Sequence, residues 1–385
     1  MKAVYDVIVI GGGPAGSTVA NYVASKGFNV LIVEKSRFPG EDNVCGGGLS
    51  QEAFRESGAD DNICEKWVFK GTHFFPWGEY RRKMKNALFR RKIFDSFLVE
   101  KAVENGAKLK TSSKVFDIKI ENGKSNVFWI DINSGKALFD SSFITVFADG
   151  PQTLASRKSP KLGFHPRPDN TALGMIYELE WKDNPLTESE YYHEPDFMQW
   201  GYGWIFPKKD ILNVGVCAPL STLRKGKKNI RNILDYFVYK YPVSSKKLHG
   251  KKVLRVAAGL IPLAPAGKIY SQSILVVGDA AGMVDPIWMG GLAHCIFAGK
   301  VAAQTIVKAL EQKDYSEEFL SRYQISWQNS KYFARIKKGL LVSRILMPFT
   351  RIDKNLPAKY TNLSFLREGR EMMKSLRYLF YPIKI

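Results

Sequence analysis

The sequence predicts an α/β protein in which a parallel sheet is interrupted along the chain by an antiparallel sheet. Residues 4–35 follow the order buried strand, helix, buried strand, which builds a parallel sheet. Residues 171–218 alternate apolar and polar side chains among many aromatics, a pattern typical of antiparallel strands. Residues 273–278 return to a short apolar strand. We therefore expect the parallel sheet to be assembled from both ends of the chain.

Each expected element rests on a local pattern. Residues 4–10 are short, β-branched and followed by glycines, and residues 29–34 form a second buried run. Between them, residues 14–26 predict a helix with Gly16 and Ala20 facing the sheet. The other expected elements are a loop at 36–50, a helix at 92–105, strands and turns over 107–147, helices near 230–240 and 291–311, and helices over 315–385.

This order of elements predicts three regions. A discontinuous nucleotide-binding domain takes residues 1–160 and 255–312. An antiparallel substrate domain takes residues 161–254, and a basic helical region takes residues 313–385. The length of 385 residues suits two to three structural lobes, at roughly 150 residues each.

Composition excludes several classes of protein. With 45% hydrophobic and 24% charged residues, the chain is globular and not disordered. The four cysteines lie far apart without a CxxC pair, so we expect neither a disulfide scaffold nor a zinc ribbon. This use of cysteine predicts a protein of a reducing compartment. The five histidines show no metal-ligand spacing. No apolar run approaches the about 20 residues of a spanning helix, and Asp6 argues against a signal peptide.

The net charge of +20 is concentrated near the C-terminus. Residues 331–385 hold 13 Lys and Arg against three acids, a net charge of +10. Two interpretations stay open for this segment: a solvated basic face, or a surface that lies on anionic lipid. Nucleic-acid binding would also suit the charge, but the sequence holds no matching motif.

A glycine turn follows the first strand. Gly11, Gly13 and Gly16 form the pattern GxGxxG between strand and helix, where a tight turn, close approach of a pyrophosphate and close helix packing each require glycine. Glu34 ends the second strand, near the expected interval for a carboxylate that binds a ribose hydroxyl. Because an acid at this position favours an unphosphorylated ribose, the motif predicts FAD or NAD.

A second glycine turn narrows the choice of cofactor to FAD. Residues 278–282 (GDAAG) follow the returning strand, with Pro286 and two glycines at 290 and 291 after them. Together with Ala148-Asp149-Gly150, these motifs resemble the FAD-dependent hydroxylase-like superfamily. The resemblance implies a glutathione-reductase-like FAD fold, in which Asp279 hydrogen-bonds the ribityl chain and the next helix begins at the flavin.

Three further segments resemble the geranylgeranyl reductases, including the digeranylgeranylglycerophospholipid reductases. Residues 202–207 (YGWIFP) resemble their YxWxFP motif, Cys45 with residues 46–48 (GGG) resembles their cysteine–glycine loop, and residues 89–95 resemble their RxxFD segment. The resemblance extends from residue 4 to about 310. The chain departs from the family at Leu292, which stands where the family has a glycine.

The resemblance assigns three sets of residues. Those expected to bind FAD are Gly11, Gly13, Pro14, Ala15, Gly16, Glu34, Lys35, Cys45, Gly46, Gly48, Arg91, Val115, Asp149, Gly150, Gly278, Asp279, Pro286, Gly290, Gly291 and Leu292. Those expected to bind substrate are Tyr202, Trp204, Phe206, Pro207 and Trp288. The expected catalytic residues are Cys45, Tyr202 and Trp204, and no metal ligand is expected.

Tyr202, Trp204 and Phe206 share one face of a strand because they are two residues apart. Such an aromatic row either packs in a core or lines a tunnel for an extended isoprenoid. The neighbouring Gly201 and Gly203 make a plain core less suitable, and the flavin motifs favour the substrate wall. Cys45 has two open roles, as a contact of the flavin or as a proton donor.

The resemblance implies an FAD-dependent reductase that saturates double bonds of geranylgeranyl chains. A flavin monooxygenase or halogenase is the alternative within the superfamily, although the sequence singles out no lysine of the kind a halogenase needs beside its flavin. A non-catalytic, flavin-bound lipid carrier is the third hypothesis. The electron donor is left open between NAD(P)H and a ferredoxin, and the proton donor between Cys45, Tyr202 and water. A lipid-sized substrate favours a cytoplasmic protein in peripheral contact with the cytoplasmic face of an anionic membrane.

Overall fold

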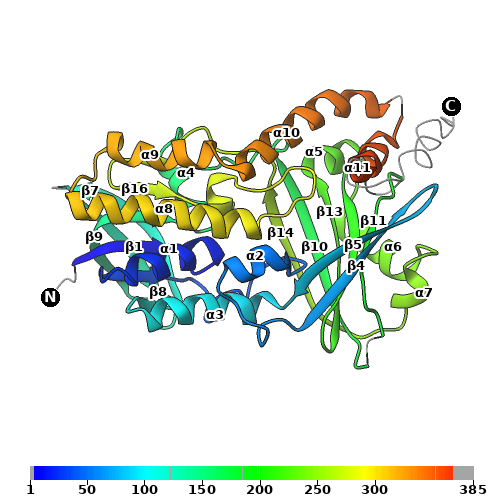
Figure 1. Ribbon diagram of the computed structural model, residues 1–385, viewed down its shortest axis with the longest axis horizontal. Helices are drawn as coiled ribbons and strands as arrows, with labels where there is room; N and C mark the ends of the chain where they lie inside the picture. Colours follow the sequence, from blue (N-terminus) through cyan, green and yellow to red (C-terminus); the bar gives the residue numbers. More distant parts are fainter. Residues whose placement is uncertain are drawn as a thin grey trace.

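The structure is a computed structural model that describes residues 4–366 apart from 122, 184, 197, 199 and 352. Two sheets stand at opposite ends of the long axis, and helices flank each of them (Figure 1). The mixed α/β class predicted from the sequence is confirmed. The last part of the expected basic helical region, 367–385, lies outside the described residues.

The first sheet is built around parallel strands from both ends of the chain. β1 (Val4–Ile10) lies between β2 (Val30–Val33) and β9 (Ala137–Phe147), and both pairings are parallel. β6 (Lys108–Lys110) and β16 (Ile274–Val276) extend the parallel part on either side. The remaining strands are β7 (Ser113–Glu121), β8 (Lys124–Asp131) and β15 (Tyr270–Ser271). The predicted return of the chain to this sheet near residue 274 is confirmed.

Helices bury the apolar faces of the first sheet. α1 (Pro14–Ala24) packs against α8 (Leu292–Gln312) so closely that a Cβ on Gly299 would lie 2.8 Å from the carbonyl oxygen of Ala15. This close approach lets two helices that begin near the glycine turns lie side by side (Figure 1). The other flanking elements are α3 (Arg91–Glu104), α4 (Leu154–Lys158), η1 (Gly278–Ala281) and α9 (Glu317–Gln328).

The second sheet is antiparallel at every pairing except one. Its order is β14 (Val253–Pro262), β10 (Thr171–Glu180), β13 (Ile211–Pro219), β12 (Tyr202–Pro207), β11 (Ser189–Tyr192), β4 (Lys66–Phe75), β5 (Gly78–Leu88) and β3 (Gly48–Ser50). The pairing of β11 with β4 is parallel. The predicted antiparallel arrangement of residues 171–218 is confirmed.

One face of this sheet is covered by three helices, α5 (Leu220–Lys225), α6 (Ile230–Tyr239) and α7 (Ser245–Leu248). Phe237 of α6 is fully buried against this sheet. The predicted helices near 230–240 and 291–311 and at 92–105 are therefore present as α6, α8 and α3.

The second sheet draws on more of the chain than residues 161–254. Strands β3, β4 and β5 come from segments that we assigned to the nucleotide-binding region, and so does most of β14. The expected loop at 36–50 also ends in a strand, β3, followed by α2 (Gln51–Glu56). The physical reason is that β4 finds its hydrogen-bonding partner, β11, more than 100 residues later, and a local pattern does not record such pairings. The domain boundaries themselves stay a prediction.

The C-terminal helices connect the two sheets. α10 (Lys331–Leu346) leads from α9 toward the second sheet, and η2 (Met347–Arg351) joins it to α11 (Leu356–Leu366) (Figure 1). Ala358 of α11 is buried with Phe75, at the end of β4. Among the described residues, no helix is both long and apolar enough to cross a membrane.

Candidate active site

The first glycine turn brings the start of α1 against the end of β9. Gly11 has φ +102°, and a Cβ there would lie 2.5 Å from the carbonyl oxygen of Ala148. A Cβ on Gly16 would lie 2.1 Å from the carbonyl oxygen of Gly11. By contrast, a Cβ on Gly13 would have no neighbour within 4 Å, so space is open at the helix N-terminus. Backbone N–H groups and this space suit a phosphate group.

Glu34 braces the same turn. Its Oε2 accepts a hydrogen bond from the backbone N–H of Gly12 at 2.7 Å, and its Oε1 accepts one from Ser36 at 2.8 Å. The side chain is buried. The carboxylate therefore supports the backbone of the turn from the position where the sequence predicts a ribose contact.

The second glycine turn meets the first. A Cβ on Gly278 would lie 2.9 Å from the Cβ of Ala15, and one on Gly282, with φ +69°, would lie 2.1 Å from the carbonyl oxygen of Ala264. Asp279 between them is close to Gly291, whose added Cβ would lie 3.2 Å from Oδ1. Burial raises the pKa of Asp279, and the positive charge of Arg91 opposes that rise.

Asp149 is the second buried carboxylate of this site. Its Oδ2 accepts a hydrogen bond from the backbone N–H of Leu154 at 2.7 Å. Its Oδ1 is buried and meets no hydrogen-bond partner among the described residues. Burial raises the pKa of this carboxyl, with Thr153 and Leu154 acting in the opposite direction. An unsatisfied buried acceptor beside the open space at Gly150 calls for a hydroxyl or amide donor.

Arg91 is held as a rigid side chain at the start of α3. Its Nε and terminal nitrogen donate to the two oxygens of Asp95, both at 2.8 Å. Asn43 donates to the same carboxylate at 2.8 Å, so the pair is anchored on two elements. Burial opposes the charge of Arg91, but the contact with Asp95 outweighs it and raises the pKa, with Cys45 adding to the rise.

The loop at Cys45 lies on the aromatic row of β12. A Cβ on Gly46 would lie 2.6 Å from Cε2 of Phe206 and 3.3 Å from Nε1 of Trp204. Asn213, fully buried on β13, accepts from Trp204 Nε1 at 2.9 Å and donates to the carbonyl oxygen of Cys45 at 3.2 Å. This bridge fixes the loop to the strand.

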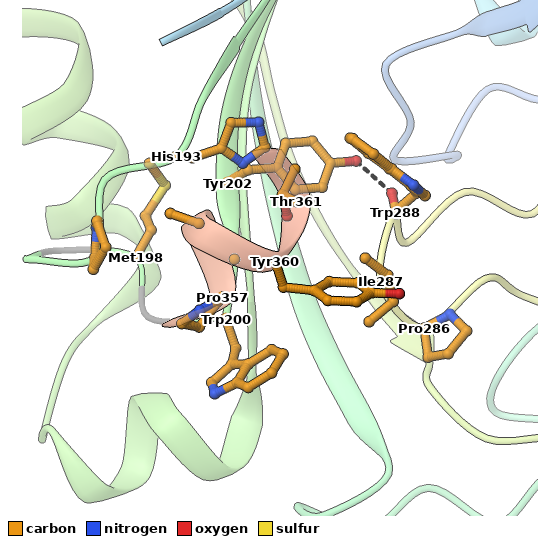
Figure 2. A pocket seen from close by; sticks show the side chains of 13 residues that line it. His193, Met198, Trp200, Tyr202, Pro286, Ile287, Trp288, Pro357, Tyr360 and Thr361 are labelled. Carbon is orange, nitrogen blue, oxygen red and sulfur yellow. Dashed lines mark hydrogen bonds between the residues drawn. The ribbon is translucent and has the colours of Figure 1, made fainter. Parts of the chain in front are cut away.

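An aromatic wall continues from this loop to α11. The Tyr202 hydroxyl donates to the carbonyl oxygen of Trp288 at 2.6 Å, as Figure 2 shows. Tyr191 packs edge-on against Phe206, with centroids 5.3 Å apart. The wall borders a pocket, whose lining residues are His193, Pro195, Met198, Trp200, Gly201, Tyr202, Pro286, Ile287, Trp288, Pro357, Ala358, Tyr360 and Thr361.

Two histidines are stacked beside the wall. His73 of β4 and His193, just after β11, join ring nitrogens at 3.1 Å, and Tyr191 stacks on His73 with centroids 4.5 Å apart. Burial lowers the pKa of His193 to about 3 and places that of His73 well below its ordinary value. Both imidazoles are therefore neutral at physiological pH, and His193 brings no positive charge to the pocket that it borders.

Comparison with known proteins points to one family. Residues 5–135 match the pyridine nucleotide-disulphide oxidoreductase family. Digeranylgeranylglycerophospholipid reductase 1 of Methanopyrus kandleri is 30% identical over 332 residues, 84% of this chain and 86% of that protein. This chain belongs to the digeranylgeranylglycerophospholipid reductase family.

Two solved structures have a fold similar to that of this chain. A geranylgeranyl bacteriochlorophyll reductase-like protein from Thermoplasma acidophilum has a TM-score of 0.78 at 25% identity, over 87% of each chain. The flavin-dependent brominase Bmp2 shares the fold, with a TM-score of 0.71 at 20% identity, over 94% of this chain and 93% of that one.

FAD is the cofactor that this reductase-family site fits. The open helix N-terminus at Gly13 suits a pyrophosphate, and the unsatisfied Oδ1 of Asp149 suits a hydroxyl donor. Asp279, buried where the two turns meet, offers a further acceptor. The donor and acceptor set therefore matches a dinucleotide that carries ribose and ribityl hydroxyls.

Most of the residues expected at the cofactor lie around these turns, and a few stand apart. Lys35 is exposed, and Val115 of β7 is half-buried against the first core. Pro286 borders the aromatic pocket. Leu292 packs with a separate cluster around Phe54 and Phe94. Trp204 and Phe206 are buried beside the Cys45 loop, and Pro207 is buried at the end of β12. None of the three lines the pocket that Tyr202 and Trp288 border.

The structure also brings in residues that sequence reasoning missed. Asn213 joins Trp204 to the Cys45 loop, His73 pairs with His193, and Lys208 lies buried next to Gly47. Asn213 and Lys208 carried a signal, since each is a polar residue inside an apolar strand or at its end. His73 carried none, because nothing local shows that β4 reaches the second sheet.

Proposed function

We propose that the protein is an FAD-dependent reductase that saturates carbon–carbon double bonds of geranylgeranyl chains, on an archaeal-type membrane lipid or a prenyl diphosphate. The observation that carries the proposal is the aromatic pocket bordered by Tyr202 and Trp288, which adjoins the Cys45 loop through Trp204. Apolar and aromatic linings suit an isoprenoid chain, which offers no hydrogen-bonding group along its length. The names of the relatives support the same substrate class.

Different residues of the chain would bind different parts of FAD. Gly13 leaves open space where the pyrophosphate of FAD would lie, and Gly11 and Gly16 allow the close packing of the turn. Asp149 and Asp279 would accept hydrogen bonds from hydroxyls of FAD. The loop from Cys45 to Gly48 and Arg91 are the residues that would hold the flavin ring. When bound and reduced, FAD supplies the hydride that alkene reduction needs.

The aromatic wall orients the substrate and excludes water. Tyr202 of β12 and Trp288 of the segment before α8 border the pocket, and Trp204 and Phe206 pack behind them toward the Cys45 loop. Burial holds the pKa of Tyr202 well above its ordinary value, and its proton is engaged with the carbonyl oxygen of Trp288. Tyr202 is therefore a positioning group, and Cys45 is the better candidate for delivering a proton to the alkene.

A peripheral membrane contact suits the outer face of α10. Lys337, Lys338 and Arg344 are exposed there, and Leu341 and Ile345 are exposed between them at 60% and 54%. Basic and apolar side chains on one helix face are typical of a helix lying on an anionic bilayer. α10 also packs on the pocket, since a Cβ on its Gly339 would lie 2.8 Å from Cγ of Pro286. A lipid held at this face would be near the substrate pocket.

The electron donor belongs to the same proposal. NAD(P)H docking transiently and an acidic ferredoxin both suit a chain with a net charge of +20. Mixing the anaerobic oxidised protein with each donor and following flavin bleaching separates the two. A rate that falls steeply with salt for the ferredoxin alone identifies the protein donor.

The halogenase alternative needs a lysine that faces the substrate. Lys208 is buried against Gly47, and Lys359 of α11 is buried in an ion pair with Asp353 at 2.9 Å. Neither lysine is among the residues that line the pocket at Tyr202. The geometry therefore favours the reductase.

Anaerobic reoxidation tests the proposed function. The flavin is reduced chemically, a geranylgeranyl lipid is added without oxygen, and the oxidised-flavin band is followed. Return of the band with a lipid that has gained hydrogen by mass spectrometry supports the reductase. A flavin that stays reduced with every prenyl substrate and reoxidises only in air contradicts it and favours oxygen chemistry.

A further inference from the structure

An indole nitrogen is buried without a partner in the wall of the aromatic pocket. Trp200 lines this pocket just before β12, and the residue as a whole is half-buried. Its Nε1 is shielded from solvent and has no hydrogen-bond partner in the part of the chain that the structure describes. A buried N–H without an acceptor costs free energy. The position therefore calls for an acceptor that comes from a ligand.

The backbone holds Trp200 in an unfavourable conformation. Its φ of +58° lies in the left-handed region, which a bulky residue seldom adopts. The next residue, Gly201, is pressed against the end of β13, because a Cβ there would lie 1.9 Å from the carbonyl oxygen of Cys217. Strained residues of this kind cluster at active sites and ligand clamps, where the surrounding structure fixes a side chain in place. The strain and the unpartnered nitrogen thus point to the same role.

The lining of the pocket brings no charge to a ligand. Among the described residues that form it, none is a lysine or an arginine, and the imidazole of His193 is neutral. The lysines next to the α11 part of the lining have carboxylate partners: Lys354 pairs with Asp196, and Lys359 with Asp353 at 2.9 Å. A diphosphate in this pocket would lose its water without gaining a cation. An uncharged oxygen, which needs a single N–H donor, fits the lining better.

Trp200 is set apart from the part of the pocket that adjoins the Cys45 loop. Figure 2 shows its indole away from Tyr202 and Trp288. Tyr202 packs on Trp204 with centroids 5.8 Å apart, and Nε1 of Trp204 lies 3.3 Å from the position that a Cβ on Gly46 would take. Because a prenyl chain carries oxygen at one end only, a bond from that oxygen to Trp200 leaves the double bonds free to extend toward the Cys45 loop.

We propose that Nε1 of Trp200 donates a hydrogen bond to the ether oxygen that joins a geranylgeranyl chain to glycerol, and so determines which double bonds reach the flavin. The inference rests on the proposed function and narrows its substrate class to a prenyl glyceryl ether, in place of a prenyl diphosphate. Because Nε1 is shielded in the structure, the oxygen reaches it as the entering chain parts the lining residues. The bond then satisfies the buried donor and fixes the position of the chain along the pocket.

Binding of saturated probes tests this assignment without any reduction. The probes are a phytanyl glyceryl ether, its carbon analogue in which a CH₂ group replaces the ether oxygen, and phytanyl diphosphate. Affinity for the oxidised holoprotein is measured from the perturbation of the flavin spectrum. Trp200→Phe keeps an aromatic ring and removes the N–H, and Trp200→His keeps a ring N–H. Trp181→Phe is the matched control, because Trp181 follows the end of β10 and does not line the pocket.

We expect the wild type to bind the ether about 3- to 10-fold more tightly than the carbon analogue, the usual effect of one hydrogen bond. In a Trp200→Phe protein that retains FAD and its melting temperature, this preference is expected to vanish through loss of ether binding alone. Trp181→Phe should keep the preference, and Trp200→His should keep part of it.

Three results overturn the proposal. Equal loss of both probes in Trp200→Phe would show that the ring acts by packing alone. A wild type that does not distinguish the ether from the carbon analogue has no donor at this place, and that comparison needs no variant. Tighter binding of the diphosphate than of the ether contradicts the narrowed substrate class.

Prenyl reduction separates this proposal from the proposed function. If the ether preference depends on Trp200 but the wild type reduces no prenyl lipid, the donor stands as a lipid-binding group and the reductase function fails. If the wild type reduces a geranylgeranyl glyceryl ether and Trp200→Phe does so with the same KM and the same double bonds saturated, the role of Trp200 is overturned. A higher KM for that ether, with a changed order of saturation by mass spectrometry, supports it.

Discussion

The hydroxyl of Tyr202 donates a hydrogen bond to the backbone carbonyl oxygen of Trp288 at 2.6 Å, across 86 residues of sequence. The bond joins β12 of the second sheet to the loop that precedes α8. Asp285 at the base of that loop is held by Arg335 of α10 at 2.5 Å. The aromatic wall, the turn after η1 and the outer helix α10 are thus one connected unit.

Removal of the Tyr202 hydroxyl is expected to loosen this connection. Tyr202→Phe leaves the Trp288 carbonyl without its donor, at a cost of about 1–3 kcal/mol in the free energy of unfolding. We also expect a higher KM for prenyl lipid. Tyr177→Phe is the matched control, because its hydroxyl bonds Asp235 at 2.6 Å away from the pocket. An equal rise in KM in both variants would remove Tyr202 from the substrate site.

Loss of the Glu34 charge is expected to weaken FAD binding. In Glu34→Gln, the carboxylate that holds Gly12 and Ser36 becomes an amide with a single acceptor oxygen. The expected cost is about 1.5–3 kcal/mol, or roughly 10-fold or more in Kd. Titration of the apoprotein with FAD, followed by flavin fluorescence, measures this change. Glu100→Gln, on the exposed side of α3, should bind as the wild type does.

A methyl group on the Cys45 loop is expected to disturb the aromatic wall. Gly46→Ala places a Cβ 2.6 Å from Phe206, so the loop or the ring must move. We expect a loss of about 1–3 kcal/mol in stability from overpacking, together with slower reduction of prenyl lipid. Denaturant unfolding and steady-state turnover measure these. Gly267→Ala, with nothing within 4 Å of the new methyl, should leave both unchanged.

The neutral histidines predict a loss of stability in acid. Burial lowers the pKa of His193 to about 3, below its unfolded value, so the unfolded chain binds the proton first. Stability is complete above the unfolded pKa of about 6.5 and falls toward the folded pKa, by about 1.4 kcal/mol per pH unit for one proton.

His193→Asn is expected to flatten the pH dependence of the unfolding free energy between about pH 6 and 4. The expected decrease in slope corresponds to the uptake of roughly one proton on unfolding. His249→Asn removes an exposed imidazole and should not change the slope. Urea unfolding at several pH values decides, and a slope that is identical in both variants contradicts the neutral pair.

The α10 face is expected to bind anionic vesicles. Replacement of Lys337 or Lys338 by Ala should weaken binding by about 5-fold each, since a basic residue at the surface contributes about 1 kcal/mol. Lys136→Ala is the control, because Lys136 is exposed at the turn between β8 and β9 of the first sheet. Sedimentation with phosphatidylglycerol vesicles measures the affinity, and equal loss in all three variants would show general charge attraction without a defined face.

Much of the nucleotide-binding region could be predicted from short segments of sequence. The strand at residues 4–10, the glycines at 11, 13 and 16 and the acid at 34 each require a particular backbone conformation or partner within one turn of the chain. The motif at Asp279 is equally local, because a strand and a helix start only a few residues on either side. The period of two in residues 202–206 also placed three aromatics on one face before any contact was known.

The sequence by itself determined the parallel sheet, the two glycine turns, the aromatic row of β12 and the reductase family. Only the tertiary structure decided that β4 pairs with β11, that His73 meets His193 across 120 residues, and that Asn213 reaches Cys45 across 168. It also decided that Lys208 stands behind the cysteine loop. The physical reason is that short-range patterns reflect backbone geometry and solvent exposure. Contacts between distant strands depend on how two sheets and their connecting helices share one core, and no single segment encodes that.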